Sequence, residues 1–339
     1  MKELIKRLTE TYGPSGNEGL IRDQIKKEIK GLADDVRTDV MGNLIAHVKA
    51  KGPAARSRKV MIAAHMDEIG FIITHVDRNG FLRFSNIGTI FPVNVIAQRV
   101  VFENGTVGTI NEEHCDNPAE PKRLDKMFID IGAESREEAL KKVAVGDVAG
   151  FQRPCQFLGN RAIAKAMDDR IGCAVAVEAM RRLKSAPNEL YFVFTAQEEV
   201  GLRGATTAAF GVTPDLGIAL DITGAFDTPE EKPKLPSVLG RGAAIKVKDA
   251  GLLVHPAVKK LMIDAAKAGK IPYQLDILEI GSTDGAAINK TKAGIPTGVI
   301  SVPARYGHSS SEMVDLLDVR ACVELLVKVL ETDLGKKLV

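Results

Sequence analysis

The stretch Leu190-Tyr191-Phe192-Val193-Phe194-Thr195-Ala196-Gln197-Glu198-Glu199-Val200-Gly201 decides the fold class. An apolar run without alternation is typical of a central parallel strand that is covered on both faces. In open parallel sheets, ligands bind in the crevice at the carboxyl ends of the strands. The stretch therefore predicts a buried strand that carries Glu198 and Glu199 to such a crevice. The alternative is an acidic pair that only solvates a loop.

Other predicted strands lead to residues of the same chemical kind. They are residues 59–64 before His65 and Asp67, residues 216–220 before Asp221, and residues 296–303 before His308. Because the carboxyl ends of parallel strands meet at one edge of a sheet, we expect these side chains to lie close together. Their recurrence argues against four independent solvating loops.

Asp168 and Asp169 stand just before a predicted helix at residues 171–183. Aspartate at this position is also a common helix N-cap, so the sequence leaves two interpretations open. Either Asp168 joins the acidic edge or the pair only caps the helix.

The candidate residues form one set of five carboxylates and two imidazoles. They are His65, Asp67, Asp168, Glu198, Glu199, Asp221 and His308. Carboxylates a few ångströms apart repel each other by roughly several kcal/mol, so the set favours cations. Histidine and carboxylate ligands without thiolate suit zinc, cobalt or manganese. Two such ions bridged by a carboxylate are the usual machinery of aminopeptidases.

Spacing suggests how the roles divide. His65 and Asp67 lie two apart on a predicted strand, so Asp67 is expected to hold the far ring nitrogen of His65. Glu198 and Glu199 are adjacent and should diverge, so that one binds metal and the other accepts a proton from water. Divergence also argues against a glycosidase pair, whose carboxyl groups converge on one bond.

The order of predicted elements indicates an α/β fold with an open, mostly parallel-cored sheet flanked by helices. After Asp67 the pattern changes to short hairpins at Asn79-Gly80 and Asn104-Gly105, and a helix is expected at residues 136–143 behind a capping box of Ser135 and Glu138. We therefore expect a small β-rich domain inserted in the chain. The predicted division is 1–68 and 158–339 for the catalytic domain and 69–157 for the insertion.

Composition excludes several classes of partner. Lys plus Arg number 46 against 44 for Asp plus Glu, so no basic surface favours nucleic acid or an anionic membrane. The four cysteines are scattered without a Cys-x-x-Cys pair, which predicts reduced thiols rather than a zinc ribbon or a disulfide framework. No signal peptide or membrane span is evident, so a cytoplasmic location is expected.

Five ordered motifs carry a family resemblance. They are His65-x-Asp67, Met167-Asp168-Asp169-Arg170, Gln197-Glu198-Glu199-Val200-Gly201, Leu220-Asp221-Ile222-Thr223 and Arg305-Tyr306-x-His308-Ser309. The series resembles metallopeptidase family 42, the tetrahedral (TET-type) glutamyl, leucyl or deblocking aminopeptidases. The resemblance covers essentially the whole chain and implies a catalytic domain of the zinc-exopeptidase type.

The resemblance implies a role for each site residue and two divalent metal ions per subunit, zinc or cobalt. Asp168 would bridge the ions, His65 and Asp221 would complete one ligand set, and Glu199 and His308 the other. Glu198 would be the general base and Asp67 would orient His65. The resemblance also implies a cis peptide bond between Asp168 and Asp169.

The implied partners are short peptide substrates and further copies of the chain. In relatives the inserted domain mediates dimer contacts, and dimers assemble into hollow dodecamers, so a homododecamer is expected here. Two departures concern the loops: Phe226 replaces a usual glycine, which could reshape a loop near the substrate, and Ser310 replaces a usual proline, which could loosen the turn after His308.

Alternative functions use the same residues differently. A related dinuclear metal deacylase or carboxypeptidase would share almost every ligand. An endoglucanase would be metal-independent, and the chain offers little sugar-stacking surface because it is 5% aromatic and contains no Trp. A metal-stabilised oligomeric binding shell would not need Glu198 as a base.

Overall fold

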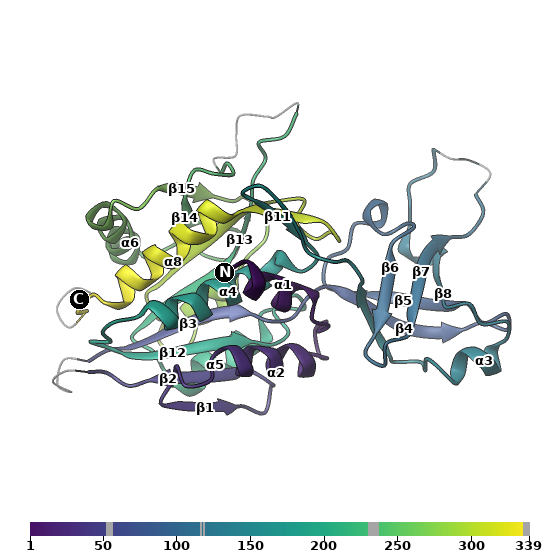
Figure 1. Ribbon diagram of the computed structural model, residues 1–339, viewed down its shortest axis with the longest axis horizontal. Helices are drawn as coiled ribbons and strands as arrows, with labels where there is room; N and C mark the ends of the chain where they lie inside the picture. Colours follow the sequence, from purple (N-terminus) through teal and green to yellow (C-terminus); the bar gives the residue numbers. More distant parts are fainter. Residues whose placement is uncertain (52–56, 116, 118, 230–236, 335–339) are drawn as a thin grey trace.

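The computed structural model describes residues 1–51, 57–115, 117, 119–229 and 237–334. A large sheet with helices on both faces occupies one end of the long axis, and a small barrel occupies the other (Figure 1). None of the described helices has the length and apolar character needed to cross a bilayer.

The large sheet has the strand order β1-β2-β12-β3-β13-β16-β17-β11-β10, and β14 pairs with β16 and β15. The strands are β1 (Asp35–Thr38), β2 (Leu44–Val48), β3 (Lys59–His65), β10 (Gln156–Leu158), β11 (Arg161–Ala164), β12 (Glu189–Thr195), β13 (Leu216–Gly224), β14 (Ala243–Lys248), β15 (Tyr273–Ile277), β16 (Thr297–Arg305) and β17 (Glu312–Asp315). The four neighbours β12, β3, β13 and β16 are parallel, whereas β1, β2, β17, β11 and β10 join antiparallel. The sheet is therefore mixed.

The register of the parallel strands brings the predicted site segments to one edge. Thr195 of β12 lies opposite His65 of β3, so both strands end at the same level. The predicted ends of the next two strands were too early. β13 continues past Asp221 to Gly224, and β16 continues to Arg305. Asp221 is therefore held by ladder pairing and not by a loop.

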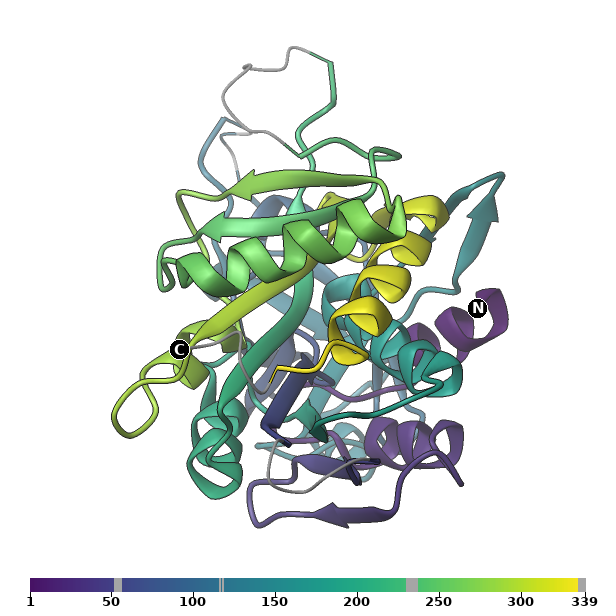
Figure 2. The same cartoon turned by 90° about the vertical axis from the view of Figure 1, so that its left-hand side faces the viewer.

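Helices cover both faces of the sheet. They are α1 (Lys2–Glu10), α2 (Gly19–Glu28), α4 (Met167–Arg182), α5 (Arg203–Val212), α6 (Pro256–Gly269), α7 (Asp284–Asn289) and α8 (Leu316–Leu330). α1, α2, α4, α6 and α8 pack over one face, where Figure 2 shows α6 beside α8, and α5 and α7 pack over the other.

Strand β3 shows why both faces need helices. Val60, Ile62 and Ala64 pack in the larger core under α4 and α8. Met61 and Ala63 point the opposite way into a smaller core with residues of α5 and α7. Successive side chains of a strand alternate between the two faces of the sheet, so a continuous apolar run must be covered on both faces. This double burial fixes the strand that ends at His65.

The barrel closes in the order β4-β5-β8-β7-β6-β9 around its own apolar core. Its elements are β4 (Gly70–Val76), β5 (Leu82–Ile87), η2 (Pro92–Asn94), β6 (Arg99–Phe102), β7 (Val107–Glu112), η3 (Leu124–Lys126), β8 (Met127–Asp130), α3 (Arg136–Leu140) and β9 (Val148–Phe151). Hairpins occur where Asn-Gly predicted them, with Gly80 and Gly105 at φ +91° and +85°.

The helix of the barrel begins as predicted but is shorter. The Ser135 hydroxyl accepts a hydrogen bond from the N–H of Glu138, which is half of the expected capping box. The Glu138 carboxylate instead accepts from the N–H of Glu134, and α3 ends at Leu140 rather than at residue 143.

A buried ion pair in the large sheet gives a test of the fold. Lys246 on β14 lies 2.8 Å from Asp276 on β15, with side-chain exposures of 0% and 2%. We expect Lys246→Met to lower the free energy of unfolding by roughly 3–5 kcal/mol, because it leaves a buried carboxylate unpaired. Lys260→Met breaks the exposed pair with Asp264 and should cost less than about 1 kcal/mol. Urea denaturation compares them, and equal losses would contradict the prediction.

Candidate metal centre

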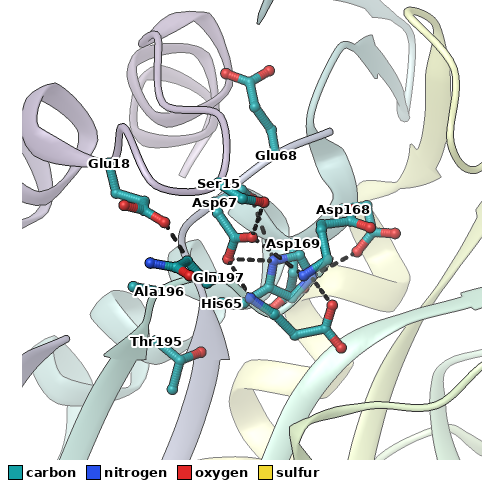
Figure 3. Close-up of polar contacts among 12 residues, drawn as sticks. Ser15, Glu18, His65, Asp67, Glu68, Asp168, Asp169, Thr195, Ala196 and Gln197 are labelled. Carbon is teal, nitrogen blue, oxygen red and sulfur yellow. Dashed lines mark hydrogen bonds and ion pairs between the residues drawn. The ribbon is translucent and has the colours of Figure 1, made fainter. Parts of the chain in front are cut away.

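The structure brings the seven predicted site residues to one place from separate segments. His65 is the last residue of β3, Asp67 follows it, Asp168 begins α4, Glu198 and Glu199 lie between β12 and α5, Asp221 is in β13, and His308 lies between β16 and β17. Figure 3 shows His65, Asp67 and Asp168 converging there.

Two overlapping groups of donor atoms share Asp168. One group is His65, Asp168 and Asp221, the other is Asp168, Glu199 and His308, and within each group the atoms lie within 4.8 Å of one another. The two oxygens of Asp168 face different groups. Oδ1 is 3.0 Å from His65 Nε2, and Oδ2 is 3.5 Å from His308 Nε2. One carboxylate therefore faces two adjacent positions, as a bridging ligand would.

The charge of this cluster favours cations. Burial raises the pKa values of Glu198, Glu199 and Asp221 well above those of ordinary carboxyl groups, and neighbouring carboxylates raise them further. Within the described part of the chain, no Lys or Arg forms an ion pair with them or with Asp168. The nearby thiol of Cys173 donates to the backbone oxygen of His65. Imidazole and carboxylate donors in this setting fit divalent zinc or cobalt.

Glu198 belongs to neither donor group but faces the same space. Its Oε2 lies 3.9 Å from Nε2 of His65, and the residue is only 8% exposed. Burial alone would lower the pKa of His65, but the charge of Glu198 and the hydrogen bond with Asp168 raise it well above the ordinary value. The two adjacent glutamates thus point to different neighbours.

Asp67 lies at the far ring nitrogen of His65, but strand alternation is not what places it there. Strand β3 ends at His65, so strand alternation does not relate the two side chains. The backbone oxygen of Asp67 lies 3.2 Å from His65 Nδ1, whereas its carboxylate Oδ1 lies at 3.6 Å. The carboxylate also accepts hydrogen bonds from the Ser15 hydroxyl and from the backbone N–H groups of Glu198 and Glu199. Asp67 therefore joins the end of β3 to the acidic segment after β12.

The backbone around the centre adopts unusual conformations. The non-glycine residues with positive φ include Ala166, Gln197, Tyr306 and His308. Such conformations persist only where neighbouring contacts hold them. Glu18 accepts from the N–H of Gln197, and Asn43 accepts from the N–H of Ala196. These contacts fix the entry to the two glutamates.

The two adjacent aspartates before the helix have different contacts. Asp168 faces the two histidines, whereas the Oδ1 atom of Asp169 accepts from the N–H of Gly172 and so caps the regular part of α4. Both interpretations of the pair thus apply, one to each residue. The peptide bond between them is cis, as the resemblance implied.

The barrel contributes to the wall of the centre. The Nδ1 atom of His308 donates to the backbone oxygen of Thr89 at 2.7 Å, which leaves Nε2 free to accept. The ring of Phe91 lies edge-on to the same imidazole. A Cβ on Gly88 would lie 3.2 Å from the side chain of Glu199. The segment that follows β5 therefore touches two of the three members of one donor group, His308 and Glu199.

Sequence reasoning missed three residues that support the centre: Ser15, Thr89 and Glu312. Ser15 stands in Gly13-Pro14-Ser15-Gly16, where the residue types indicate only a turn. Thr89 acts through its backbone oxygen, which no side-chain pattern can indicate. Glu312 follows three serines, and its place four residues after His308 was the only signal.

The two departures from the family pattern have defined places. A Cβ on Gly224 would lie 2.5 Å from the ring of Phe226, so the ring packs on the end of β13. Ser310 is 5% exposed, and its hydroxyl donates to the side-chain oxygen of Gln98, just before the barrel strand β6. The serine therefore ties the turn after His308 to the barrel.

Comparisons with known proteins agree with this architecture. A family model described as M42 glutamyl aminopeptidase matches residues 42–325. The chain is 50% identical over 328 residues to a putative aminopeptidase of Acetivibrio thermocellus, covering 97% of this chain and 98% of that protein. It resembles aminopeptidase APDkam598 of the archaeon Desulfurococcus kamchatkensis with a TM-score of 0.95 and 39% identity, over 99% of this chain and 96% of that one.

A further solved structure is the TET1 peptidase of Pyrococcus horikoshii, described as able to assemble into a tetrahedron or a large octahedral shell. It matches with a TM-score of 0.86 and 31% identity, over 97% of this chain and 98% of that one. These similarities extend across nearly the whole chain and so include both the sheet and the barrel.

A buried carboxylate behind the centre gives a pH-dependent prediction. Asp284 accepts a hydrogen bond from Thr195 and is 1% exposed, and burial raises its pKa to about 6. A raised carboxyl pKa stabilises the fold below the unfolded value near 3.8, and this contribution is lost as pH rises through about 6. Relative to Asp284→Asn, the wild type should lose about 3 kcal/mol between pH 4 and 7.

Urea denaturation of metal-free protein at several pH values measures this difference. Parallel curves for the wild type and Asp284→Asn would contradict the prediction.

Proposed function

This chain belongs to the M42 glutamyl aminopeptidase family and is therefore an aminopeptidase, and we propose that it removes N-terminal residues from short peptides with two divalent metal ions. The observation that carries the proposal is the pair of donor groups that share Asp168. Zinc and cobalt suit these donors. The parallel strands at the centre of the large sheet would then form the core of a catalytic domain of the zinc-exopeptidase type.

Each protein ligand has a proposed place. His65 and Asp221 would hold one ion and Glu199 and His308 the other, with Asp168 between them. Bound there, divalent ions would supply Lewis acidity to the peptide carbonyl and an acidified water. Asp67 and Thr89 orient the two imidazoles through their contacts at Nδ1.

Glu198 is the proposed general base. Its carboxylate faces His65 but is not part of either donor group, so it remains free to exchange a proton. In the metal-free protein, burial and neighbouring carboxylates raise its pKa well above that of an ordinary glutamate. The hydrogen bond from its N–H to Asp67 fixes where its side chain begins.

The barrel is proposed to serve self-association. The Pyrococcus horikoshii TET1 peptidase assembles into closed shells, and this chain matches it across both parts of the fold. Residues 69–157 would form the contact between two copies, and dimers would build a homododecamer that encloses the sites. The exposed apolar side chains Val107, Leu140 and Val145 support a contact surface on the barrel.

The adjacent glutamates provide a matched test of the proposed mechanism. Glu198→Gln should lower kcat roughly 10²–10⁴-fold, because it removes the base, while the protein still binds both ions. Glu199→Gln should instead weaken metal binding, because it removes a ligand. Initial rates on aminoacyl p-nitroanilides and metal analysis after dialysis measure the two effects. Full activity of chelated, metal-free wild type would refute the proposal.

Assembly is tested by mass. Light scattering should give a mass near that of twelve chains of 36.5 kDa. Combined Leu140→Glu and Val145→Glu substitutions should reduce the mass, because charge is placed on the proposed contact, whereas Leu140→Gln with Val145→Thr should reduce it less. A barrel variant that keeps the wild-type mass would exclude this surface as the contact.

A further inference from the structure

Glu312 makes two hydrogen bonds that meet at the metal centre. Its Oε2 atom accepts from the backbone N–H of Asp168 at 3.0 Å, and its Oε1 atom accepts from the backbone N–H of His308 at 2.8 Å. The residue is 2% exposed. One carboxylate therefore connects the main chains of two proposed ligands that are far apart in sequence.

The sheet places Glu312 where it can make this connection. Glu312 begins β17 and lies opposite Ala164, the last residue of β11. Four residues later the chain reaches Asp168, and the loop that carries His308 ends at Glu312 itself. The antiparallel pair thus holds the carboxylate between the two ligand-bearing segments.

The backbone that Glu312 supports needs external contacts. His308 has φ +57°, and Tyr306 in the same loop has φ +61°. These left-handed conformations are unfavourable for residues other than glycine. The hydrogen bond to the N–H of His308 spans four residues and closes this loop.

We propose that Glu312 is a positioning residue that sets the separation of Asp168 and His308 and thereby the geometry of the metal position they share with Glu199. This inference rests on the proposed dinuclear centre. Groups that orient metal ligands without binding the metal are commonly worth 10–100-fold in metal affinity. Glu312 acts on the ligands' main chains rather than on their side chains.

A carboxylate suits this role better than an amide. Both of its oxygens accept, so it satisfies two N–H donors at once. In Glu312→Gln the amide nitrogen would face one N–H group, and donor would oppose donor. The substitution keeps size and shape, so its effect reports the lost acceptor.

The chain contains a matched control. The carboxylate of Asp318 is also buried and accepts from two backbone N–H groups, those of Gly240 and Gly242, each at 2.7 Å. Both glycines lie outside the metal centre. Asp318→Asn therefore breaks the same kind of bridge without touching a proposed ligand.

The experiment titrates chelated full-length wild type, Glu312→Gln and Asp318→Asn with Co²⁺ against a chromogenic chelator, and records the visible Co²⁺ spectrum. We expect Glu312→Gln to bind one of two equivalents about 10–100-fold more weakly, with an altered spectrum, and excess Co²⁺ to restore part of kcat/KM. Asp318→Asn should bind both equivalents like the wild type, even if its melting temperature falls.

Two results would overturn the inference in distinguishable ways. If Glu312→Gln binds both equivalents with wild-type affinity, Glu312 has no positioning role, although the proposed function stands. If the wild type itself binds no Co²⁺ at micromolar concentration, the dinuclear centre is refuted and the inference falls with it. Should Glu312→Gln not fold, Glu312→Asp keeps the charge but shortens the reach, and it should show the same selective loss.

Discussion

The site depends on the hydrogen bonds that the carboxylate of Asp67 accepts. This carboxylate accepts from Ser15 at the N-terminal segment and from the N–H groups of Glu198 and Glu199, and it faces the ring of His65. Burial would raise the pKa of Asp67, but His65 and these donors hold it below the ordinary value. The charged form is therefore kept, and one anion fixes two strand ends and the turn before α2. A rigid arrangement of this kind is what metal ligands require.

Near Asp67, the described part of the fold contains two kinds of buried carboxylate: one that is paired with Lys and Arg, and others that are not. Glu68 is paired with Lys165 at 2.7 Å and with Arg170 at 3.4 Å, and Arg170 also donates to the backbone oxygen of Leu8. These charges are neutralised within the protein and tie α1 to β3 and α4. The carboxylates of the donor groups have no such partners among the described residues. The contrast between the paired Glu68 and the unpaired acids of the donor groups distinguishes the scaffold from the proposed metal site.

The barrel and the sheet meet at the same centre. Thr89 orients His308, Gly88 allows the chain to approach Glu199, and Gln98 holds Ser310. A segment that is separate in its core is therefore part of the site wall. In the proposed assembly, the barrel would both contact another copy of the chain and orient His308 through Thr89. Association would therefore be physically connected to the geometry of the site.

The sequence by itself determined which strands lead to the site and the chemistry of the residues that follow from them. Apolar runs before His65, Glu198 and Asp221 predict buried strands, because only a sheet covered on both faces accepts them. The Asn-Gly pairs likewise predicted hairpins of the barrel, since few residues adopt the required turn. The sequence by itself could not determine the lengths of β13 and β16, because pairing with neighbouring strands sets where they end.

Tertiary structure alone decided how the ligands are held. The bridge of Glu312, the backbone oxygen of Thr89 and the hydroxyl of Ser15 act between segments tens to hundreds of residues apart. Hydrogen bonds to main-chain groups leave no periodic or local pattern, because any residue supplies the N–H or the oxygen. The side chains that can bind metal can thus be recognised in the sequence, whereas their relative positions are set only when the chain folds.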